Sequence, residues 1–310
     1  MVVFILGPTA SGKTKVSIEL AKKIGGEVVG ADSVQIYRDL VIGAASPTIE
    51  EREGIPHHLI GIYELKDEIN AGIYIDIAVS AIDDIKSRGK IPIVVGGTNF
   101  YVDALINGLS PVPELDSLKR KEFNTLLEKF STEELFAKLL TVDSEWATQI
   151  SSPNDRQRIG RGLEVFELTG KKLSEWNKLS KIKKFQHTFL SFAIEVERET
   201  LYQKINNRSE TIVKSGLVEE VKRVNKAGFN TSNCNPLNSI GYLQADQFLK
   251  GIISDEDELV LTIARDTRHL AKRQMTWLKK RSYLQWGKAD SVIEAALRAV
   301  PNICHNVSKN

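Results

Sequence analysis

The sequence predicts an α/β protein in which a parallel sheet flanked by helices is interrupted by an all-helical insertion. Over the first 110 residues, short β-branched runs alternate with longer amphipathic stretches, the pattern of strands joined by crossover helices. From Ser110 the stretch PVPELDS breaks this rhythm, and residues 117–185 are rich in Leu, Glu, Lys and Arg, which favour helices. A strand-like run, FLSFAIEVE, returns at 189–197, so we expect the chain to rejoin the sheet there.

The expected strands are residues 2–6, 27–31, 58–62, 91–95 and 189–197. The run at 58–62 fits a strand or a core helix equally well, because it is too short to show a period. We expect helices at 13–24 and 72–89, several in the insertion, and three more at 199–227, 240–250 and 256–282. In the insertion, Asp155 is typical of a helix start and Gly170 of a helix end. The core domain would comprise residues 1–112 plus 188–310, and the insertion 113–187.

Composition indicates an ordinary globular chain: 310 residues, 42 % apolar and 26 % charged. Cys234 and Cys304 are far apart and lack metal-type spacing, so the sequence indicates neither a disulfide framework nor a zinc site and favours a reducing, cytoplasmic setting. The N-terminal run VVFIL is too short for a signal or membrane segment. We expect a cytoplasmic monomer that does not associate with membranes.

The motif GPTASGKT, between the first expected strand and helix, matches G-x-x-x-x-G-K-[ST] in full, in the context that a P-loop requires. Its backbone amides and the start of the next helix can hold linked phosphates, Lys13 can neutralise their charge, and Thr14 can ligate Mg²⁺. The core is therefore predicted to be P-loop NTPase-like. The loop does not distinguish ATP from a prenyl diphosphate. Its diphosphate-binding residues would be Gly7, Pro8, Thr9, Ala10, Ser11, Gly12, Lys13 and Thr14.

Asp32 and Ser33 follow the second expected strand and should lie beside the P-loop, because ligands bind at the carboxyl ends of parallel strands. Asp32 could be a Mg²⁺-linked carboxylate, a general base, or only the cap of a turn. Thr98, after the fourth expected strand, could bond a substrate or belong to a tight turn into a helix. His57 and His58 would point to opposite faces of a strand, which favours packing or hydrogen bonding over a shared metal.

Residues 260–288 contain eight basic residues and one acid, Asp266. At 100° per residue, Arg265, Arg268, Lys272 and Lys279 form one stripe of the expected helix, opposite an apolar face. A solvated helix face usually mixes both charges, so this stripe favours contact with a polyanion.

Together these stretches resemble the tRNA dimethylallyltransferases, also called tRNA isopentenyltransferases. The resemblance covers nearly the whole chain, through GPTASGKT, ADSVQIYRDLVIG, PHHL, GGTNFYVDALINGL, NDRQRIGRGLEVFELTGKKLS, GLVEEV, IGY and LAKRQMTWLKK in order. It implies transfer of a dimethylallyl group from dimethylallyl diphosphate to the exocyclic amine of the adenine 3′ of the anticodon, tRNA position 37, with Mg²⁺ as cofactor.

The resemblance also implies roles for residues. Asp32 would be the base, with Lys13 and Thr9 the other catalytic residues, and the insertion would contact the anticodon stem-loop. Contacts with tRNA would come from Asp32, Ser33, Val34, Gln35, Thr98, Arg120, Arg156, Gln157, Arg158, Ile159, Gly160, Arg268 and Lys272.

Two alternatives stay open: a P-loop kinase of a small metabolite, and an isopentenyltransferase acting on free adenine nucleotides. The chain also departs from the usual family pattern at Ala44, Ser46, Gly61 and Gln244.

Overall fold

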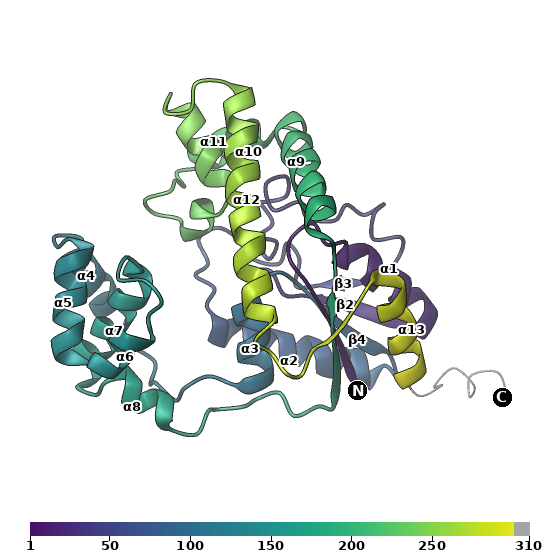
Figure 1. Ribbon diagram of the computed structural model, residues 1–310, viewed down its shortest axis with the longest axis horizontal. Coiled ribbons are helices and arrows are strands. Elements are labelled where there is room, and N and C mark those ends of the chain that lie inside the picture. The colour runs from purple at the N-terminus through teal and green to yellow at the C-terminus, as the bar shows by residue number, and fades with distance from the viewer. Residues whose placement is uncertain (301–310) are drawn as a thin grey trace. The chain divides into compact units, whose positions relative to one another are not determined.

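The computed structural model describes residues 1–300, which form two compact units (Figure 1). Residues 1–106 and 184–300 make up the first unit, and residues 107–183 the second. The expected insertion, 113–187, begins six residues and ends four residues later than the second unit. Cys234 is a buried free thiol, and Cys304 lies outside the described residues.

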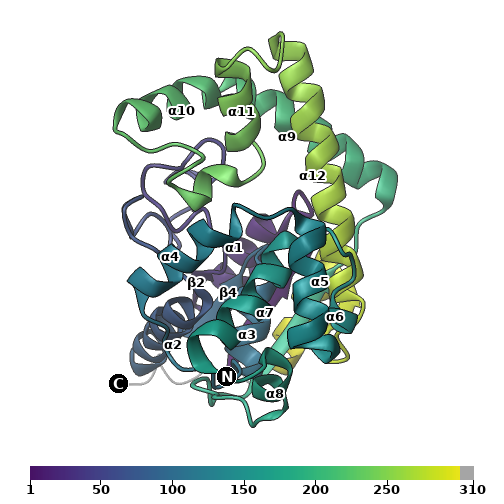
Figure 2. The ribbon, with the colours of Figure 1, turned by 90° about the vertical axis from the view of Figure 1, so that its left-hand side faces the viewer.

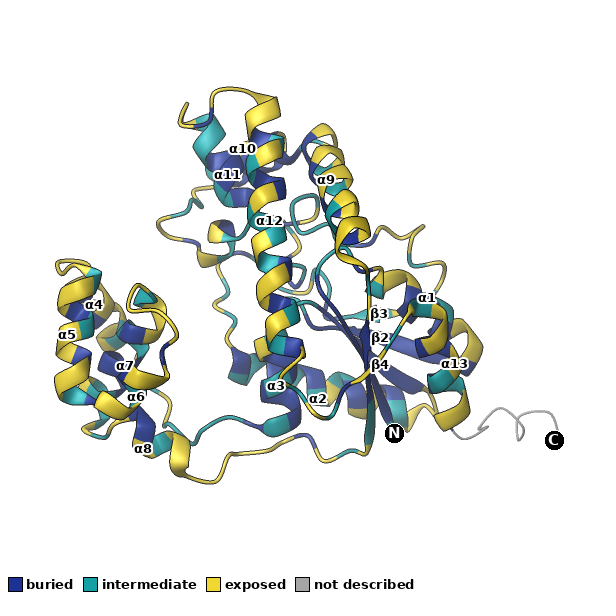
Figure 3. Ribbon diagram, viewed as in Figure 1, coloured by how far each residue is buried: buried dark blue, intermediate teal, exposed yellow. Residues whose placement is uncertain are grey.

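Six strands of the described chain form a single sheet in which every pairing is parallel. They are β1 (Val2–Leu6), β2 (Gly26–Gly30), β3 (His57–His58), β4 (Ile91–Val95), β5 (Phe189–Ile194) and β6 (Gln285–Gly287), in the order β3-β2-β4-β1-β5-β6. Strands β1, β2 and β4 are buried along their whole length (Figure 3). Burial on both faces explains the continuous apolar runs of β1 and β4.

Helices cover both faces of the sheet (Figure 1). On one face, Val16 and Leu20 of α1 (Lys13–Ile24) and Val292 of α13 (Ala289–Ala299) pack against strand residues. On the other, α2 (Ala71–Ser87) packs against β2 and β4. Helix α3 (Asn99–Asn107) follows β4 directly. The carboxyl ends of β1, β2 and β4 thus come together at one edge, where their following loops meet.

The helices after β5 build a second core above that edge (Figure 2). They are α9 (Arg198–Lys214), α10 (Leu217–Lys226), α11 (Tyr242–Leu249) and α12 (Glu256–Leu278), with a 3₁₀ turn at Asn235–Asn238. Ile36, Tyr37 and Leu40, from the loop after β2, pack among their apolar residues. The C-terminal helices therefore position the segment that follows Asp32.

The second unit is helical, with α4 (Ser117–Leu127), α5 (Thr132–Val142), α6 (Ser144–Gln149), α7 (Arg156–Thr169) and α8 (Leu173–Lys178) around its own apolar core. As predicted, the Asp155 side chain caps α7 by accepting the Arg158 N–H, and Gly170 ends the helix in the left-handed conformation.

The predicted fold class is confirmed, and β1, β4 and α1 have the expected limits. The strand expected at 58–62 is wrong, because Leu59 and Gly61 have φ of 63° and 65° and break the extended chain after His58. The strand expected at 189–197 stops at Ile194. The single helix expected at 199–227 is two helices, separated at Gly216, which has φ of 98°. Strand β6 and helix α13 were not expected, whereas α3 is the helix that one interpretation of Thr98 placed after a tight turn. Within residues 1–300, no helix is long and apolar enough to cross a membrane.

Candidate active site

The P-loop joins β1 to α1, and its lysine turns back onto the loop. Gly12 has φ of 90°, a conformation that favours glycine, and leads directly into α1. Lys13 Nζ donates to the carbonyl oxygens of Gly7, over 2.9 Å, and Pro8, over 2.7 Å. Burial and, to a smaller extent, the positive charge of Arg208 together lower the pKa of Lys13 to about 7, against the opposing effect of Asp32. An anion in this loop would stabilise the ammonium form.

Arg208, on α9, is a second cation at this site, and the sequence analysis missed it. Burial lowers its pKa, while the charge of Asp32 acts in the opposite direction. Among the described residues, no group forms a hydrogen bond or ion pair with its guanidinium. An arginine held beside Lys13 without a partner is suited to bind phosphate oxygens, which match its planar fork.

Asp32 uses its two carboxylate oxygens differently. Oδ1 accepts the backbone N–H groups of Val34, over 2.9 Å, and Gln35, over 3.2 Å. No described residue donates to Oδ2. The turn-capping interpretation of Asp32 is therefore correct for one oxygen, while the other remains available to accept a proton.

The loop after β4 lies against the loop after β2. A Cβ atom on Gly96 would lie 2.0 Å from the Ala31 carbonyl oxygen, so only glycine allows this approach. Thr98 Oγ1 accepts the Ser33 N–H over 2.9 Å, and the Thr98 N–H donates to the Ala31 carbonyl over 3.1 Å. Thr98 begins a tight turn into α3, as one of the two interpretations of the sequence predicted. It also orients Ser33, the residue next to Asp32.

A buried carboxylate from α10 holds the loop at residues 41–46, where the chain departs from the usual family pattern at Ala44 and Ser46. Glu220, 1 % exposed, accepts N–H groups of Val41, Ile42 and Gly43 and the hydroxyl of Tyr242, which lies 2.7 Å away. This loop in turn accepts both donors of the Gln35 amide, at the carbonyls of Ala44 (3.1 Å) and Ala45 (3.4 Å). Gln35 consequently presents Oε1 as its remaining polar atom.

Two departures from the usual family pattern have local explanations. Gly61 has φ of 65°, which an aspartate at that position would adopt less readily. The Gln244 amide donates to Asp266 Oδ2 over 2.9 Å, whereas a glutamate there would place two carboxylates together. Ala44 keeps its N–H bonded to the Tyr242 hydroxyl, and Ser46 Oγ is buried without a partner in the described chain.

The basic stripe of α12 is exposed at Arg265, Lys272 and Lys279. Arg268 lies partly buried, donates to Asn206 Oδ1 over 2.6 Å and sits over the Tyr202 ring of α9. On the opposite face, where the periodicity places apolar residues, Ile263 and Leu278 are buried and Leu270 and Trp277 are partly buried. His57 and His58 are bonded to protein groups: the Ile55 carbonyl and Glu27, respectively.

The remaining predicted tRNA contacts belong to the second unit, which does not contain the P-loop. Arg120 pairs with the buried Glu164, and Arg156 donates to the Leu127 carbonyl over 2.6 Å. Ile159 is fully buried in the core of the unit. Gln157 and Arg158 are exposed, and Gly160 is partly so. Gln157 and Arg158 are thus the residues of this segment whose side chains are most open to a partner.

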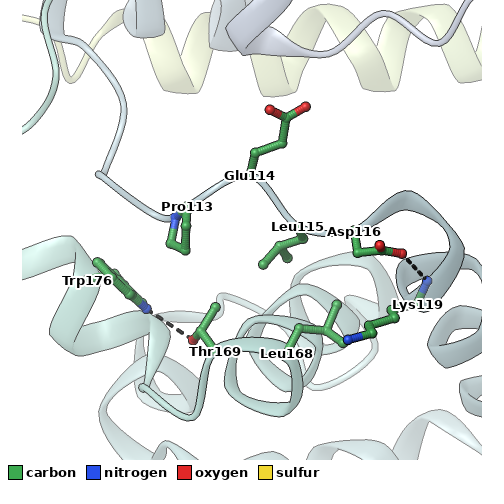
Figure 4. Close-up of a pocket in the computed structure, with 8 residues that line it drawn as sticks. All are labelled: Pro113, Glu114, Leu115, Asp116, Lys119, Leu168, Thr169 and Trp176. Carbon is green, nitrogen blue, oxygen red and sulfur yellow. Dashed lines mark hydrogen bonds between the residues drawn. The ribbon is translucent and has the colours of Figure 1, made fainter.

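A cavity of about 390 Å³ also lies in the second unit (Figure 4). Two pairs of its polar groups serve local structure: Asp116 accepts the Lys119 N–H at the start of α4, and the Trp176 indole donates to Thr169 Oγ1. None of its lining residues belongs to the P-loop or to the loops around Asp32, so it does not share the chemistry of that site.

A phosphate loop, two cations and a free carboxylate oxygen at the carboxyl edge of a parallel sheet define a P-loop enzyme. The profile of the IPP transferase family matches residues 35–281. The chain belongs to this family.

Relatives and solved structures agree. The chain is 41 % identical over 284 residues to tRNA dimethylallyltransferase 2 of Geotalea uraniireducens, covering 92 % of this chain and 91 % of that protein. It is 40 % identical to tRNA dimethylallyltransferase of Caldanaerobacter subterraneus, covering 92 % and 90 %. The crystal structure of the full-length tRNA isopentenylpyrophosphate transferase from Bacillus halodurans matches with a TM-score of 0.69 and 33 % identity, over 96 % of this chain and 94 % of that one. A eukaryotic dimethylallyltransferase acting on tRNA matches with a TM-score of 0.73 and 31 % identity, over 96 % and 77 %.

Proposed function

We propose that this protein transfers a dimethylallyl group from dimethylallyl diphosphate to the exocyclic amine of the adenine at tRNA position 37, giving N6-isopentenyladenosine and diphosphate. The observation that supports it most is the free Oδ2 of Asp32 beside the two cations Lys13 and Arg208. A cationic loop can accept a departing diphosphate, while an adjacent carboxylate can accept a proton from an attacking amine.

The reaction balances on these groups. The allylic carbon–oxygen bond breaks and its electron pair leaves with the diphosphate, whose charge Lys13, Arg208 and the loop amides stabilise. The adenine N6 forms the new bond to that carbon. Its proton passes to Asp32 Oδ2, because Oδ1 already accepts two backbone N–H groups.

Magnesium fits the residues present. The Thr14 side chain is exposed at the first turn of α1, and no hydrogen bond from the described residues occupies its hydroxyl. Mg²⁺ prefers oxygen ligands and commonly combines one protein group with substrate phosphates and water. When bound, it would neutralise charge on the diphosphate. Thr14 would be its protein ligand.

The basic side chains of α12 and of the second unit support RNA as the acceptor. The exposed Lys272 and Arg265, with Arg268, suit phosphate contacts, which bring affinity with little sequence preference. Base recognition would fall to Gln35 and to the backbone of Ser33 and Val34, beside Asp32. A loop adenine is easier to unstack than a paired one, which suits a site at the sheet edge.

The test is to incubate the full-length protein with Mg²⁺, labelled dimethylallyl diphosphate and unmodified tRNA with adenine at position 37. Nuclease digestion and mass spectrometry should yield N6-isopentenyladenosine, and the same tRNA with guanine at position 37 should stay unlabelled. Phosphate transfer from ATP to a small metabolite, or label only on free AMP, would overturn the proposal in favour of one of the two alternatives.

A further inference from the structure

Gln274 of α12 joins two loops of the site that are far apart in the sequence. The residue is buried, with 7 % of its surface exposed. Oε1 accepts the backbone N–H of Thr9 over 2.8 Å, and Nε2 donates to the Gly97 carbonyl over 2.8 Å. The two bonds fix the orientation of the amide, because only its oxygen can accept and only its nitrogen can donate.

One end of this bridge is the P-loop. The Thr9 N–H is one of the backbone donors in that loop, and Gln274 engages it before any anion binds. Ala10, the next residue, has φ of 62° and packs against the apolar cluster that α12 forms with α9 through Ala271, Leu201 and Ile205. The first half of the P-loop is therefore anchored to α12 rather than to the sheet alone.

The other end of the bridge is the loop that orients Asp32. Gly97 precedes Thr98, which accepts the Ser33 N–H. A Cβ atom on Gly97 would lie 3.0 Å from Gln274 Nε2 and 3.9 Å from Asp32 Oδ2. Gln274 thus approaches the free oxygen of Asp32 across a residue that has no side chain.

We infer that Gln274 is a positioning residue that sets the separation between the diphosphate loop and Asp32. This inference rests on the proposed function. Gln274 acts through the backbone of Thr9 and Gly97, so its loss should misplace the reacting groups more than it weakens binding. A misplacement of about 1 Å can cost about a hundredfold in rate.

The full-length variants Gln274→Glu and Gln274→Met separate positioning from general packing. Methionine has a similar length and makes neither bond at any pH. A protonated glutamic acid can make both, since its carbonyl oxygen accepts from Thr9 and its hydroxyl donates to Gly97. An ionised glutamate loses the bond to Gly97.

Both variants would be assayed from pH 6 to 8.5 for kcat and for the KM of each substrate. We expect kcat of Gln274→Met to fall about a hundredfold, with each KM changing less than about threefold. The kcat ratio of Gln274→Glu to Gln274→Met should rise at least about tenfold as pH falls, because protonation restores the second bond. Asp32, Lys13 and Arg208 around the site, and Arg273 on α12, are the same in both variants, so their influence largely cancels in this ratio.

A flat ratio, or a loss confined to KM, would overturn the inference. If Gln274→Met does not fold, the pH dependence of Gln274→Glu relative to the wild type decides alone. Gln247→Met on α11, whose side chain makes no bond in the described chain, is the matched control and should keep wild-type kcat. A wild-type protein inactive on tRNA would refute the proposed function. An active wild type with an unimpaired Gln274→Met would refute only the role of Gln274.

Discussion

Thr98 Oγ1 accepts the backbone N–H of Ser33 across 2.9 Å and so joins the ends of β4 and β2. Replacing Thr98 with Val removes this acceptor and leaves a partly buried N–H unsatisfied, which costs about 1–3 kcal/mol. We expect Thr98→Val to lower both the free energy of unfolding and kcat, and Thr98→Ser to keep most of each. Urea unfolding and steady-state turnover measure the two effects. A Thr98→Ser variant as impaired as Thr98→Val would show that the methyl group matters instead.

Asp32→Asn should separate the two roles of this carboxylate. Asparagine can still accept the Val34 and Gln35 N–H groups through its oxygen, but it cannot take a proton from the adenine amine. We expect kcat to fall about 10²–10⁴-fold with tRNA affinity nearly unchanged. Single-turnover assays and filter binding provide the measurements. Asp32→Ala should add a loss of stability, because it also removes the turn cap.

Arg208→Gln should weaken binding of inorganic diphosphate and raise the KM for the prenyl donor, each by tenfold or more, without a comparable change in the KM for tRNA. The reason is that its guanidinium has no partner among the described residues and lies near Lys13. Isothermal titration calorimetry measures the first effect. Arg198→Gln, at the exposed start of α9, is the matched control; an equal loss there would indicate only a general effect of charge.

Lys13, with a pKa of about 7, should make diphosphate binding depend on pH. An anion favours the ammonium form, so binding above pH 7 should take up a proton, and affinity should fall as pH rises from 7 to 9. Calorimetry in buffers of different ionisation enthalpy measures this uptake. Lys13→Arg stays charged and corrects for titration of the ligand. Equal proton uptake by both proteins would contradict the prediction.

The same shift affects stability in the absence of ligand. The pKa of Lys13 is lower in the folded chain than in the unfolded one, so the unfolded chain binds more protons between pH 7 and about 10.5. The contribution of Lys13 to the free energy of unfolding should therefore rise with pH across this window. Lys13→Met should flatten that slope in urea unfolding.

Replacing Glu220, a buried residue of α10, with glutamine should strongly lower the free energy of unfolding. Its carboxylate accepts three backbone N–H groups and the Tyr242 hydroxyl, and an amide nitrogen cannot replace an acceptor. Each unsatisfied group costs about 1–3 kcal/mol. We expect a lower urea midpoint and a higher KM for tRNA, because the loop also orients Gln35. The exposed neighbour Glu219, which pairs with Lys222, is the control; Glu219→Gln should cost no more than about 1 kcal/mol.

The sequence by itself determined the structural features that depend on residues close together in the chain. Continuous apolar runs predicted β1 and β4 correctly, since a parallel strand covered on both faces must be apolar throughout. The P-loop motif predicted the start of α1, and Asp155 and Gly170 predicted the two ends of α7. These features are predictable because glycine conformations and helix caps depend only on residues close by in the chain. A partial signal existed for Gln274: it is a polar residue at a position of α12 that the helical period assigns to the buried face.

Only the tertiary structure decided which distant side chains meet. Nothing in the sequence near Arg208 distinguishes it from the solvated charges of α9, and its place near Lys13 follows from how α9 packs against α12 and Ala10 of the P-loop. Gln274 forms a hydrogen bond with Thr9, 265 residues away in the sequence, and Glu220 forms one with Ile42, 178 residues away. The division of labour between the two oxygens of Asp32 likewise depends on the direction of the following turn. Such contacts arise from packing between elements, whereas the periodicity of a sequence reports only which face of an element is buried.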